Sequence, residues 1–407
     1  MKPANKISRR SMIGTAASMS LAAPVARAAE ASEPSKKKPA ASNPSPLPTR
    51  KLGRNGPEVS ILAVGGQAEA TSVEYYENVW NAGIRYFDMA DCYRGGKSEK
   101  ALGAWLREHP ERRKEVFIVD KDHPKQIADI PAMLDKRLDI LGTDYLDMFL
   151  IHGLGAREYG EECYDWPKSP EYKKMCERMK KSGKTNLMGF SCHDMQNERF
   201  LHAAAEGGFV DAILTPASPF HAKGDGIDRA FDACHKAGIG LINMKVMRNA
   251  KNVPKRLPEF DKLGLTTHQG VLHALWSDER VTAGCIWMAN DEELASNSEA
   301  ARLYREPLQI ADLKVLRDCV LASGAAMCPG CASCLAHAAQ HGTDLKSISR
   351  FVAYYEQDGT QEAARLYQAM RPSERNVEGV DLEAMREACD YHVNYPEIVK
   401  RAKRYFA

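Results

Sequence analysis

Short apolar, strand-like segments alternate with amphipathic helical segments over most of this chain of 407 residues. The strand-like segments occupy residues 59–64, 84–88, 115–121, 145–151, 187–191, 210–215, 239–245 and 281–287. Helical segments lie between and after them, the first four near residues 72–82, 97–108, 125–140 and 169–182. Because parallel strands need crossover helices, this alternation predicts an α/β fold with a parallel sheet. Eight strand–helix units in about 250 residues favour a closed (β/α)8 TIM barrel.

The barrel is predicted to span residues 48–305, with a small hairpin at 48–60 that covers its floor. A doubly wound open sheet is the alternative, but no Gly-x-Gly-x-x-Gly motif follows the first strand. Beyond residue 305 the alternation stops, and helices are predicted near 310–324, 344–357, 359–370, 381–388 and 396–405. We interpret residues 306–407 as a separate, helical C-terminal subdomain.

Residues 1–28 have the pattern of an export signal. Two consecutive arginines at positions 9 and 10 precede a weakly apolar stretch, and Ala26 and Ala28 place small residues at the signal-peptidase positions. The pattern resembles a twin-arginine signal, an address that a receptor reads. A disordered basic N-terminus is the alternative interpretation. From the resemblance to a twin-arginine signal we expect export to the periplasm or another extracytoplasmic compartment.

Charge and composition limit the classes of partner. Residues 29–47, rich in Pro, Ser and Lys, are predicted to form a disordered linker. The formal net charge of +2 gives no reason to expect a nucleic-acid partner. No apolar run approaches the roughly 18 residues that cross a bilayer, so no membrane span is expected after signal removal. A small-molecule substrate and a redox partner remain as the expected partners.

Four polar residues follow predicted strands two, three and four: Asp88, Tyr93, Lys121 and His152. In (β/α)8 barrels the active site lies at the carboxyl ends of the strands, so the barrel would bring these residues together. A tyrosine near a lysine can act as a proton donor, because the cation stabilises the developing phenolate. Each residue by itself is more often structural than catalytic. Because all four follow neighbouring predicted strands, together they predict a catalytic site.

The segments around these residues resemble the aldo/keto reductase family. The similar segments are residues 51–54, 82–88, 93–99, 145–152 and 189–193, and the resemblance covers about residues 48–305. It implies that Tyr93 protonates a carbonyl oxygen while a nicotinamide cofactor, NADP or NAD, supplies a hydride. It also implies that Lys121, paired with Asp88, lowers the pKa of Tyr93. His152 would orient the carbonyl and assist proton transfer.

The resemblance further implies a cofactor site. Ser191 matches the position that holds the nicotinamide carboxamide, and Gly284, Asn290 and Asn297 match the loop and helix that bind the adenosine phosphate. The N-terminus of that helix would favour an anion. No Lys or Arg occurs between residues 281 and 301 to bind a 2′-phosphate.

Two positions depart from the family's cofactor pattern. Cys192 replaces the usual asparagine after Ser191, and Leu214 stands where a glutamine is expected. These departures motivate an alternative function, in which a non-catalytic barrel serves as a redox carrier or a metal-stabilised interaction module.

A cysteine cluster in the C-terminal region resembles a bacterial ferredoxin motif. Cys328, Cys331 and Cys334 form C-x2-C-x2-C, but the fourth position of the run is Ala338. Cys389 resembles the last cysteine of a second run that lacks its first three ligands. In two-cluster ferredoxins the last cysteine of each run ligates the other cluster, so the surviving cysteines form one complete site. We expect one 4Fe–4S cluster on these four cysteines.

Two other interpretations of the cysteine cluster stay open. The first is a structural zinc site, to which His337 and His341 could supply nitrogen ligands. The second is a relic that binds nothing. The sequence as a whole favours an exported oxidoreductase with a ferredoxin-like iron–sulfur subdomain.

Overall fold

The computed structural model describes residues 45–66, 70–194, 196–221, 224, 226–250, 252–323, 327, 328, 334, 342–358, 361–389 and 391–406. These residues belong to one compact unit, Asn43–Ala407. The predicted signal and nearly all of the predicted linker lie outside the described residues. So do Cys331, His337, His341 and Ala338.

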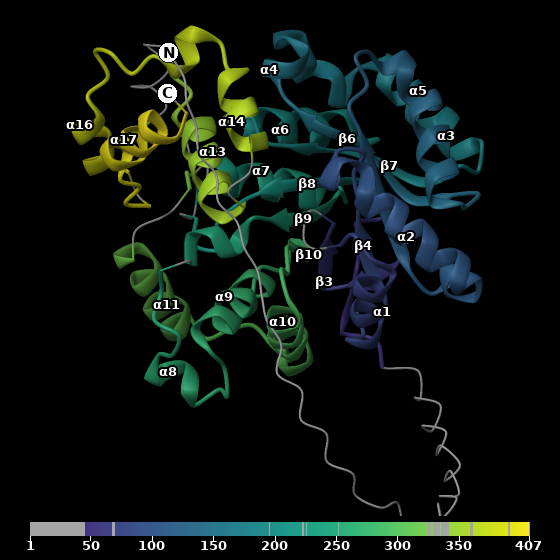
Figure 1. Ribbon diagram of the computed structural model, residues 1–407, viewed down its shortest axis with the longest axis horizontal. Coiled ribbons are helices and arrows are strands. Elements are labelled where there is room, and N and C mark those ends of the chain that lie inside the picture. The colour runs from purple at the N-terminus through teal and green to yellow at the C-terminus, as the bar shows by residue number, and fades with distance from the viewer. Residues whose placement is uncertain are drawn as a thin grey trace, which may run out of the picture. The chain divides into compact units, whose positions relative to one another are not determined.

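In the described part of the chain, eight parallel strands close into a barrel in the order β10-β3-β4-β5-β6-β7-β8-β9 (Figure 1). The strands are β3 (Leu62–Gly65), β4 (Tyr86–Asp88), β5 (Phe117–Asp122), β6 (Leu146–Leu154), β7 (Thr185–Cys192), β8 (Ala212–Pro216), β9 (Gly240–Met244) and β10 (Val281–Ile286). Cys285 of β10 pairs with Ala63 of β3 and with Met244 of β9, which closes the ring. This topology confirms the predicted (β/α)8 barrel.

A helix follows each barrel strand and packs outside it. These helices are α1 (Val73–Asn81), α2 (Lys97–Glu108), α3 (Ile130–Leu141), α5 (Pro170–Lys181), α6 (Asn197–Gly207), α7 (Gly226–Lys236), α9 (Thr267–Trp276) and α10 (Asp291–Leu303). Side chains cap several of them. Ser72 accepts a hydrogen bond of 3.2 Å from the Tyr75 amide at the start of α1, and Thr266 forms a capping box with Gln269 at the start of α9.

The predicted hairpin is present at the floor of the barrel. Strands β1 (Thr49–Lys51) and β2 (Glu58–Ser60) pair antiparallel. The Arg54 amide donates a hydrogen bond of 2.7 Å to the Gly238 carbonyl, close to the start of β9. Leu52 and Val59 belong to the apolar cluster that fills the barrel interior, together with Ala63, Tyr86, Val119, Leu150 and Ile242 among others. The hairpin therefore covers the amino ends of the strands and leaves their carboxyl ends for a site.

The C-terminal helices have a hydrophobic core of their own. They are α13 (Leu345–Asp358), α14 (Gln361–Gln368), α15 (Pro372–Arg375), α16 (Leu382–Glu387) and α17 (Tyr395–Phe406), whereas the buried residues of α11 (Ile310–Ala322) belong to the barrel core. Ile348, Val352 and Ile398 are fully buried in this second core, which forms mainly where α13 packs on α14 and α17. The helical C-terminal region agrees with the prediction.

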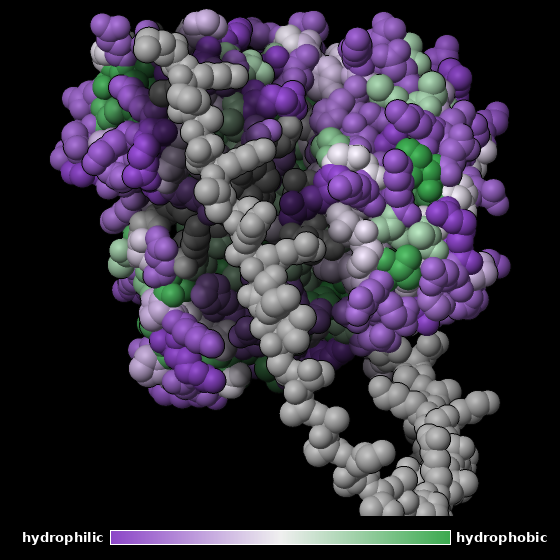
Figure 2. Space-filling model, in the orientation of Figure 1, coloured by the Kyte–Doolittle hydropathy of each residue, from purple (hydrophilic) through white to green (hydrophobic). Residues whose placement is uncertain are grey.

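The visible surface is mainly hydrophilic. Figure 2 shows polar residues over most of one face, with apolar residues in small separate patches. Within the described residues, no helix is both long and apolar enough to cross a membrane.

Candidate active site

The four residues singled out in the sequence lie at the carboxyl ends of neighbouring strands. Asp88 is the last residue of β4, Lys121 lies one residue before the end of β5, and His152 lies near the end of β6. These three strands are consecutive in the barrel. Tyr93 begins a short 3-10 turn after β4. The structure therefore brings the four residues to one edge of the barrel.

The backbone after Tyr93 turns sharply. Arg94, Gly95 and Gly96 have φ angles of 49°, 65° and 78°, all in the left-handed region. Glycine enters this region without the steric cost that a Cβ imposes, so the Gly95–Gly96 pair permits the turn. The turn leads directly into α2, which starts at Lys97. Tyr93 is thereby held between a strand end and a helix start.

Lys121 and Asp88 form a buried ion pair. Lys121 Nζ donates to Asp88 Oδ1 over 2.5 Å and to the Met89 carbonyl over 2.5 Å. The side chains are only 0% and 2% exposed. Burial raises the pKa of Asp88, and the Lys121 cation opposes that rise. The two charges are therefore held together inside the barrel mouth.

Tyr93 lies between this ion pair and His152. Lys121 Nζ lies 5.0 Å from the centroid of the Tyr93 ring. The His152 ring is perpendicular to the Tyr93 ring, with 5.6 Å between the centroids. This places a phenol and an imidazole side by side at the same opening.

The protonation of Tyr93 differs from the expectation. Burial raises the pKa of Tyr93 well above its usual value, and the charge of Asp88 raises it further. The lowering that we expected from Lys121 therefore does not decide the direction of the net shift in the pKa of Tyr93. Asp88, 2.5 Å from the Lys121 ammonium, acts on the tyrosine with the opposite sign of charge. Tyr93 is therefore a neutral phenol, suited to act as an acid.

His152 is a neutral imidazole at physiological pH. Burial lowers the pKa of His152 to about 3, although Asp91 acts in the opposite direction. A neutral imidazole can orient a carbonyl through a hydrogen bond. It cannot supply the proton of an imidazolium, so the expected help with proton transfer is limited to hydrogen bonding.

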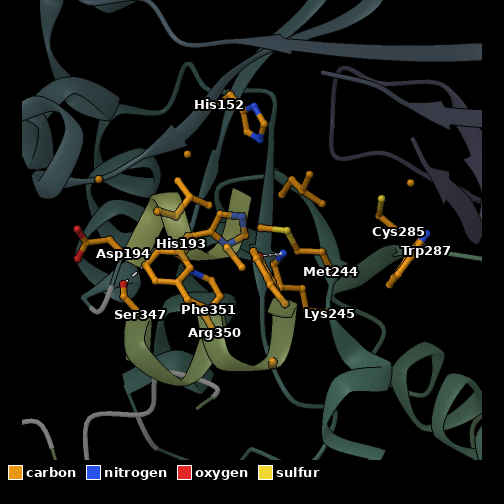
Figure 3. A pocket seen from close by; sticks show the side chains of 18 of the residues that line it. His152, His193, Asp194, Met244, Lys245, Cys285, Trp287, Ser347, Arg350 and Phe351 are labelled. Atoms are coloured by element: carbon orange, nitrogen blue, oxygen red, sulfur yellow. Dashed lines mark hydrogen bonds between the residues drawn. The ribbon is translucent and has the colours of Figure 1, made fainter. Parts of the chain in front are cut away.

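A cavity of about 1780 Å³ opens at these strand ends. Asp88, Tyr93 and His152 line its barrel side, whereas Ser347, Arg350, Phe351 and Tyr354 of α13 line another side. Figure 3 shows Ser347, Arg350 and Phe351 on the α13 ribbon, with His193 and Lys245 near them. The C-terminal helices thus form one wall of the barrel's cavity.

Three contacts hold this wall against the barrel. Lys245 Nζ donates to the hydroxyl of Tyr354, and Lys346 Nζ donates to the Asp194 carbonyl. Arg157 donates a hydrogen bond of 3.3 Å to the Leu366 carbonyl of α14. Lys245 follows β9 with a φ of 64°, a left-handed conformation that is unfavourable for a lysine. Such local strain is commonly found at functional sites.

Two cations, Lys245 and Arg350, act on His193 in the cavity. His193 lines the cavity, and burial lowers its pKa well below the usual value. The charges of Lys245 and Arg350 lower the same pKa further. His193 therefore stays neutral beside two cations.

Two of the predicted cofactor residues line the cavity. They are Asn290 and Asn297, which lie in front of α10 and within it. Asn290 accepts a hydrogen bond of 2.9 Å from the Glu293 amide and so caps the helix. The first turn of α10 carries three carboxylates, from Asp291, Glu292 and Glu293. A helix start favours an anion, but these carboxylates oppose a highly charged one.

The other predicted cofactor residues have structural partners. Ser191 Oγ accepts a hydrogen bond of 2.8 Å from the Gly153 amide and is 1% exposed. A Cβ at Gly284 would lie 2.7 Å from Leu275 Cδ2, so a larger residue there would force the Leu275 side chain of α9 to shift. Of the two departures, Leu214 lines the cavity, whereas Cys192 is fully buried in the outer core of the barrel.

Three of the four predicted cysteine ligands meet in the C-terminal core. Cys328, Cys334 and Cys389 are each buried in the same apolar cluster. Cys334 Sγ lies 3.5 Å from the hydroxyl of Tyr395. Burial raises the pKa of Tyr395, and all three cysteines raise it further, so all three lie near this one side chain. The fourth predicted ligand, Cys331, lies outside the described residues.

Sequence reasoning did not select several residues of the cavity. Lys245 directly follows a predicted strand, and His193 follows Ser191 in a segment already matched to the family, so both carried a positional signal. Arg350 and Tyr354 carried none, because periodicity alone does not show which side of α13 faces the barrel.

The sequence profile described as the Aldo/keto reductase family matches residues 60–306 of this chain. Among curated proteins, an NAD/NADP-dependent indole-3-acetaldehyde reductase of Schizosaccharomyces pombe is 32% identical over 107 residues, which are 24% of this chain and 36% of that protein. A glyoxal reductase of Bacillus subtilis is 30% identical over 145 residues, 34% of this chain and 47% of that protein. This chain therefore spans less than half the length of these relatives.

Solved structures show the same fold. An aldo-keto reductase of Bacillus halodurans in its holo form superposes with a TM-score of 0.53 at 19% identity, covering 67% of this chain and 96% of that one. A thermostable aldo-keto reductase in complex with the inhibitor epalrestat gives a TM-score of 0.52 at 21% identity, covering 66% of this chain and 98% of that one. In both cases the similarity covers nearly the whole neighbour but only about two thirds of this chain.

Proposed function

This chain belongs to the aldo/keto reductase family, and on that premise we propose that it reduces a small carbonyl compound, or oxidises the corresponding alcohol, with a nicotinamide cofactor. One observation carries the proposal. A protonated tyrosine, Tyr93, faces a large cavity and is backed by the buried Lys121–Asp88 pair and by a neutral histidine, His152. This combination is suited to proton donation and is costly to bury without a function.

The cavity fits a dinucleotide. Its volume of about 1780 Å³ exceeds the roughly 300–1,000 Å³ of ordinary small-ligand pockets. It extends from Tyr93 to Asn290 and Asn297 at α10, so one cofactor could contact both regions. Lys255 also lines it, and its carbonyl accepts a hydrogen bond from the Thr267 amide at the start of α9. A cation and a helix start are suitable partners for a pyrophosphate.

When bound, the nicotinamide would supply or accept the hydride at the substrate carbon. Tyr93 donates its phenolic proton to the carbonyl oxygen as negative charge develops there. The Lys121 ammonium, 5.0 Å from the centroid of the ring, would oppose the cost of the resulting phenolate, which burial and Asp88 raise. His152 holds the carbonyl oxygen by a hydrogen bond. The α13 wall, with Phe351 and Tyr354, excludes water from the reacting atoms.

NAD is the proposed cofactor in preference to NADP. The three carboxylates in the first turn of α10 would repel a 2′-phosphate, and the segment 281–301 contains no Lys or Arg. Titration calorimetry with NADH and NADPH on anaerobically purified protein tests both the reductase proposal and this preference. We expect NADH to bind at least about tenfold more tightly, equivalent to about 1.4 kcal/mol. Absence of binding for both nucleotides would contradict the proposed function.

A charge-reversal variant sharpens that measurement. Glu292 is exposed and lines the cavity, so Glu292→Lys should reduce the preference for NADH to about threefold or less. Glu299→Lys is the matched control, since Glu299 is exposed on the same helix but does not line the cavity. Equal shifts in both variants would indicate a general effect of charge rather than contact with the 2′ position.

We further propose that the C-terminal region holds one 4Fe–4S cluster on Cys328, Cys331, Cys334 and Cys389. The burial of three of these cysteines around Tyr395 supports the proposal, because thiolates are the ligands of such clusters. The amide of Cys328 donates a hydrogen bond of 3.0 Å to Ser349 Oγ on α13, the helix that also lines the cavity. A bound cluster would supply one-electron chemistry and a rigid anchor for this helix.

Removal of one cysteine tests the iron–sulfur proposal. Anaerobically purified protein should contain about four iron and four sulfide per chain, and Cys389→Ser should lower both to below about one. Cys319→Ser is the control, since Cys319 lies on α11 against the barrel core. Elemental analysis and visible absorbance are the measurements. Zinc in place of iron, or equal metal in both variants, would contradict the cluster.

Export by the twin-arginine route is also proposed, on the pattern of residues 1–28. Folding around a tightly bound cofactor before export would supply nucleotide to an extracytoplasmic enzyme. The measurement is the N-terminal sequence of protein recovered from the periplasm, expected to begin at Ala29. Recovery of uncleaved protein from the cytoplasm alone would contradict it.

A further inference from the structure

Four potential metal ligands converge beside Tyr93. Asp91 and Cys92 directly precede it, His123 follows β5, and His152 lies near the end of β6. One donor atom from each of these residues lies within 4.8 Å of all the others. The set contains two imidazoles, a carboxylate and a thiol. Only His152 belongs to the proposed catalytic residues.

The spacing of the donors resembles that of a tetrahedral site. Asp91 Oδ1 lies 3.2 Å from His123 Nδ1 and 3.7 Å from His152 Nδ1. Cys92 Sγ lies 3.8 Å from the same His152 nitrogen. Ligands at about 2.0–2.3 Å from a tetrahedral zinc ion are separated from one another by about 3.3–3.6 Å. Small side-chain rotations would bring these four donors to that spacing.

The central oxygen of this group lacks a hydrogen bond. Asp91 Oδ1 is shielded from solvent and has no hydrogen-bond partner, although two ring nitrogens approach it. A buried polar atom without a partner requires an explanation, and an ion is one of the few available. A cation between the oxygen and the two nitrogens would satisfy all three atoms at once.

The ring nitrogen of His152 that faces Asp91 also faces Cys92. His152 Nδ1 lies 3.7 Å from Asp91 Oδ1 and 3.8 Å from Cys92 Sγ. A cation bound to Nδ1 would take the place of the thiol proton between these two atoms and would leave the imidazole proton on Nε2.

We propose that Asp91, Cys92, His123 and His152 bind a divalent transition-metal ion, with Zn²⁺ as the ion that suits this donor set. Two neutral imidazoles, a carboxylate and a thiolate are typical zinc ligands, and tetrahedral geometry is the usual one for zinc. Cys92 would release its thiol proton on binding. The His123 side chain is 43% exposed and lines the cavity, which gives the ion a route of entry.

The ion would act on the reaction through His152. Binding at Nδ1 fixes the proton on Nε2, so His152 becomes a permanent hydrogen-bond donor toward the cavity. Only this second step rests on the proposed reductase function. The metal site itself stands or falls on metal binding alone.

Cobalt substitution tests the site directly. Full-length protein, stripped with a chelator and loaded with Co²⁺, should show the visible bands of tetrahedral cobalt and a near-ultraviolet thiolate charge-transfer band. In Cys92→Ser the charge-transfer band should weaken while the visible bands persist. In His123→Ala both should decrease, because a ligand is lost. His202→Ala, an exposed histidine on α6, is the matched control and should match the wild type.

Zinc stoichiometry separates this site from the C-terminal cysteines. By elemental analysis after equilibrium dialysis, the wild type should bind one Zn²⁺ per chain more than His123→Ala does. Equal stoichiometry and equal cobalt spectra in these two proteins would overturn the proposed site. The comparison remains valid whatever the C-terminal cysteines bind, since both proteins contain them.

Kinetics then test the role of the ion. We expect His123→Ala to lower kcat about tenfold with little change in the KM for nucleotide, a usual effect of disturbing a metal-bound histidine. Metal binding with an unchanged kcat would overturn the role assigned to His152. Nucleotide binding without extra zinc would overturn the site but leave the reductase proposal intact. Zinc binding without nucleotide binding would overturn the reductase proposal but leave the metal site intact.

Discussion

Tyr93→Phe should lower kcat for carbonyl reduction by about 10²–10⁴-fold, the range that a positioned proton donor contributes. The change removes the phenolic proton and keeps the ring. The contacts of the ring with His152, 5.6 Å away, and with the Lys121 ammonium, 5.0 Å away, should therefore persist. Stopped-flow measurement of nucleotide oxidation gives the rate. Nucleotide affinity and the thermal midpoint should stay close to those of the wild type.

The pH profile of the wild type follows from the same residue. Burial and Asp88 raise the pKa of Tyr93, so the protonated acid extends to higher pH than in free tyrosine. Reduction by the wild type should therefore show no loss from Tyr93 ionisation up to at least about pH 9. If Lys121 dominated, it would lower the pKa of Tyr93. The rate of reduction would then begin to fall below about pH 9.

Tyr164→Phe is the matched control for this experiment. Tyr164 also lines the cavity, but its hydroxyl donates a hydrogen bond of 3.1 Å to Asp194 Oδ1. Its loss should change kcat by less than about threefold. Retention of wild-type kcat in Tyr93→Phe would exclude Tyr93 as the acid and favour the non-catalytic interpretation of the barrel.

Lys121→Met should destabilise the protein by about 3–5 kcal/mol, because it leaves the Asp88 carboxylate buried without its cation. Asp88 is only 2% exposed and Lys121 is fully buried, so water cannot replace the lost partner. The measurement is the free energy of unfolding from denaturant titration at pH 7. The double variant Asp88→Asn with Lys121→Met should recover part of the loss, because it removes the unpaired charge.

The deficit of Lys121→Met should depend on pH. Burial already raises the pKa of Asp88, and without the opposing cation this pKa rises further. A carboxyl group whose pKa is raised in the folded state favours that state at low pH. This contribution to stability is lost as the pH rises. The variant should therefore be closest to the wild type near pH 4 and furthest from it near pH 8. A deficit that is independent of pH, or no recovery in the double variant, would mean that packing of the lysine stem dominates instead.

Several elements followed directly from the sequence. Alternation of strand-like and helical segments predicted the (β/α)8 barrel and the floor hairpin, because their hydrophobic periodicity is local. The same alternation placed Asp88, Lys121 and His152 at strand ends, and a barrel gathers such ends on one face. The helices beyond residue 306 were also predicted, because a helix is defined by neighbours a few residues apart.

Only the tertiary structure decided which site residues carry a proton and which helix forms the second wall of the cavity. The sequence suggested that Lys121 acts on Tyr93, whereas in the folded protein burial and the charge of Asp88 raise the pKa of the tyrosine. The wall formed by Arg350 and Tyr354 comes from a helix about 100 residues beyond Lys245, and no local pattern encodes that contact. Sequence determines which groups stand at the ends of strands, because strand and helix periods are short-range. Which proton each group holds depends on burial and on neighbours distant in the chain, and these exist only once the chain has folded.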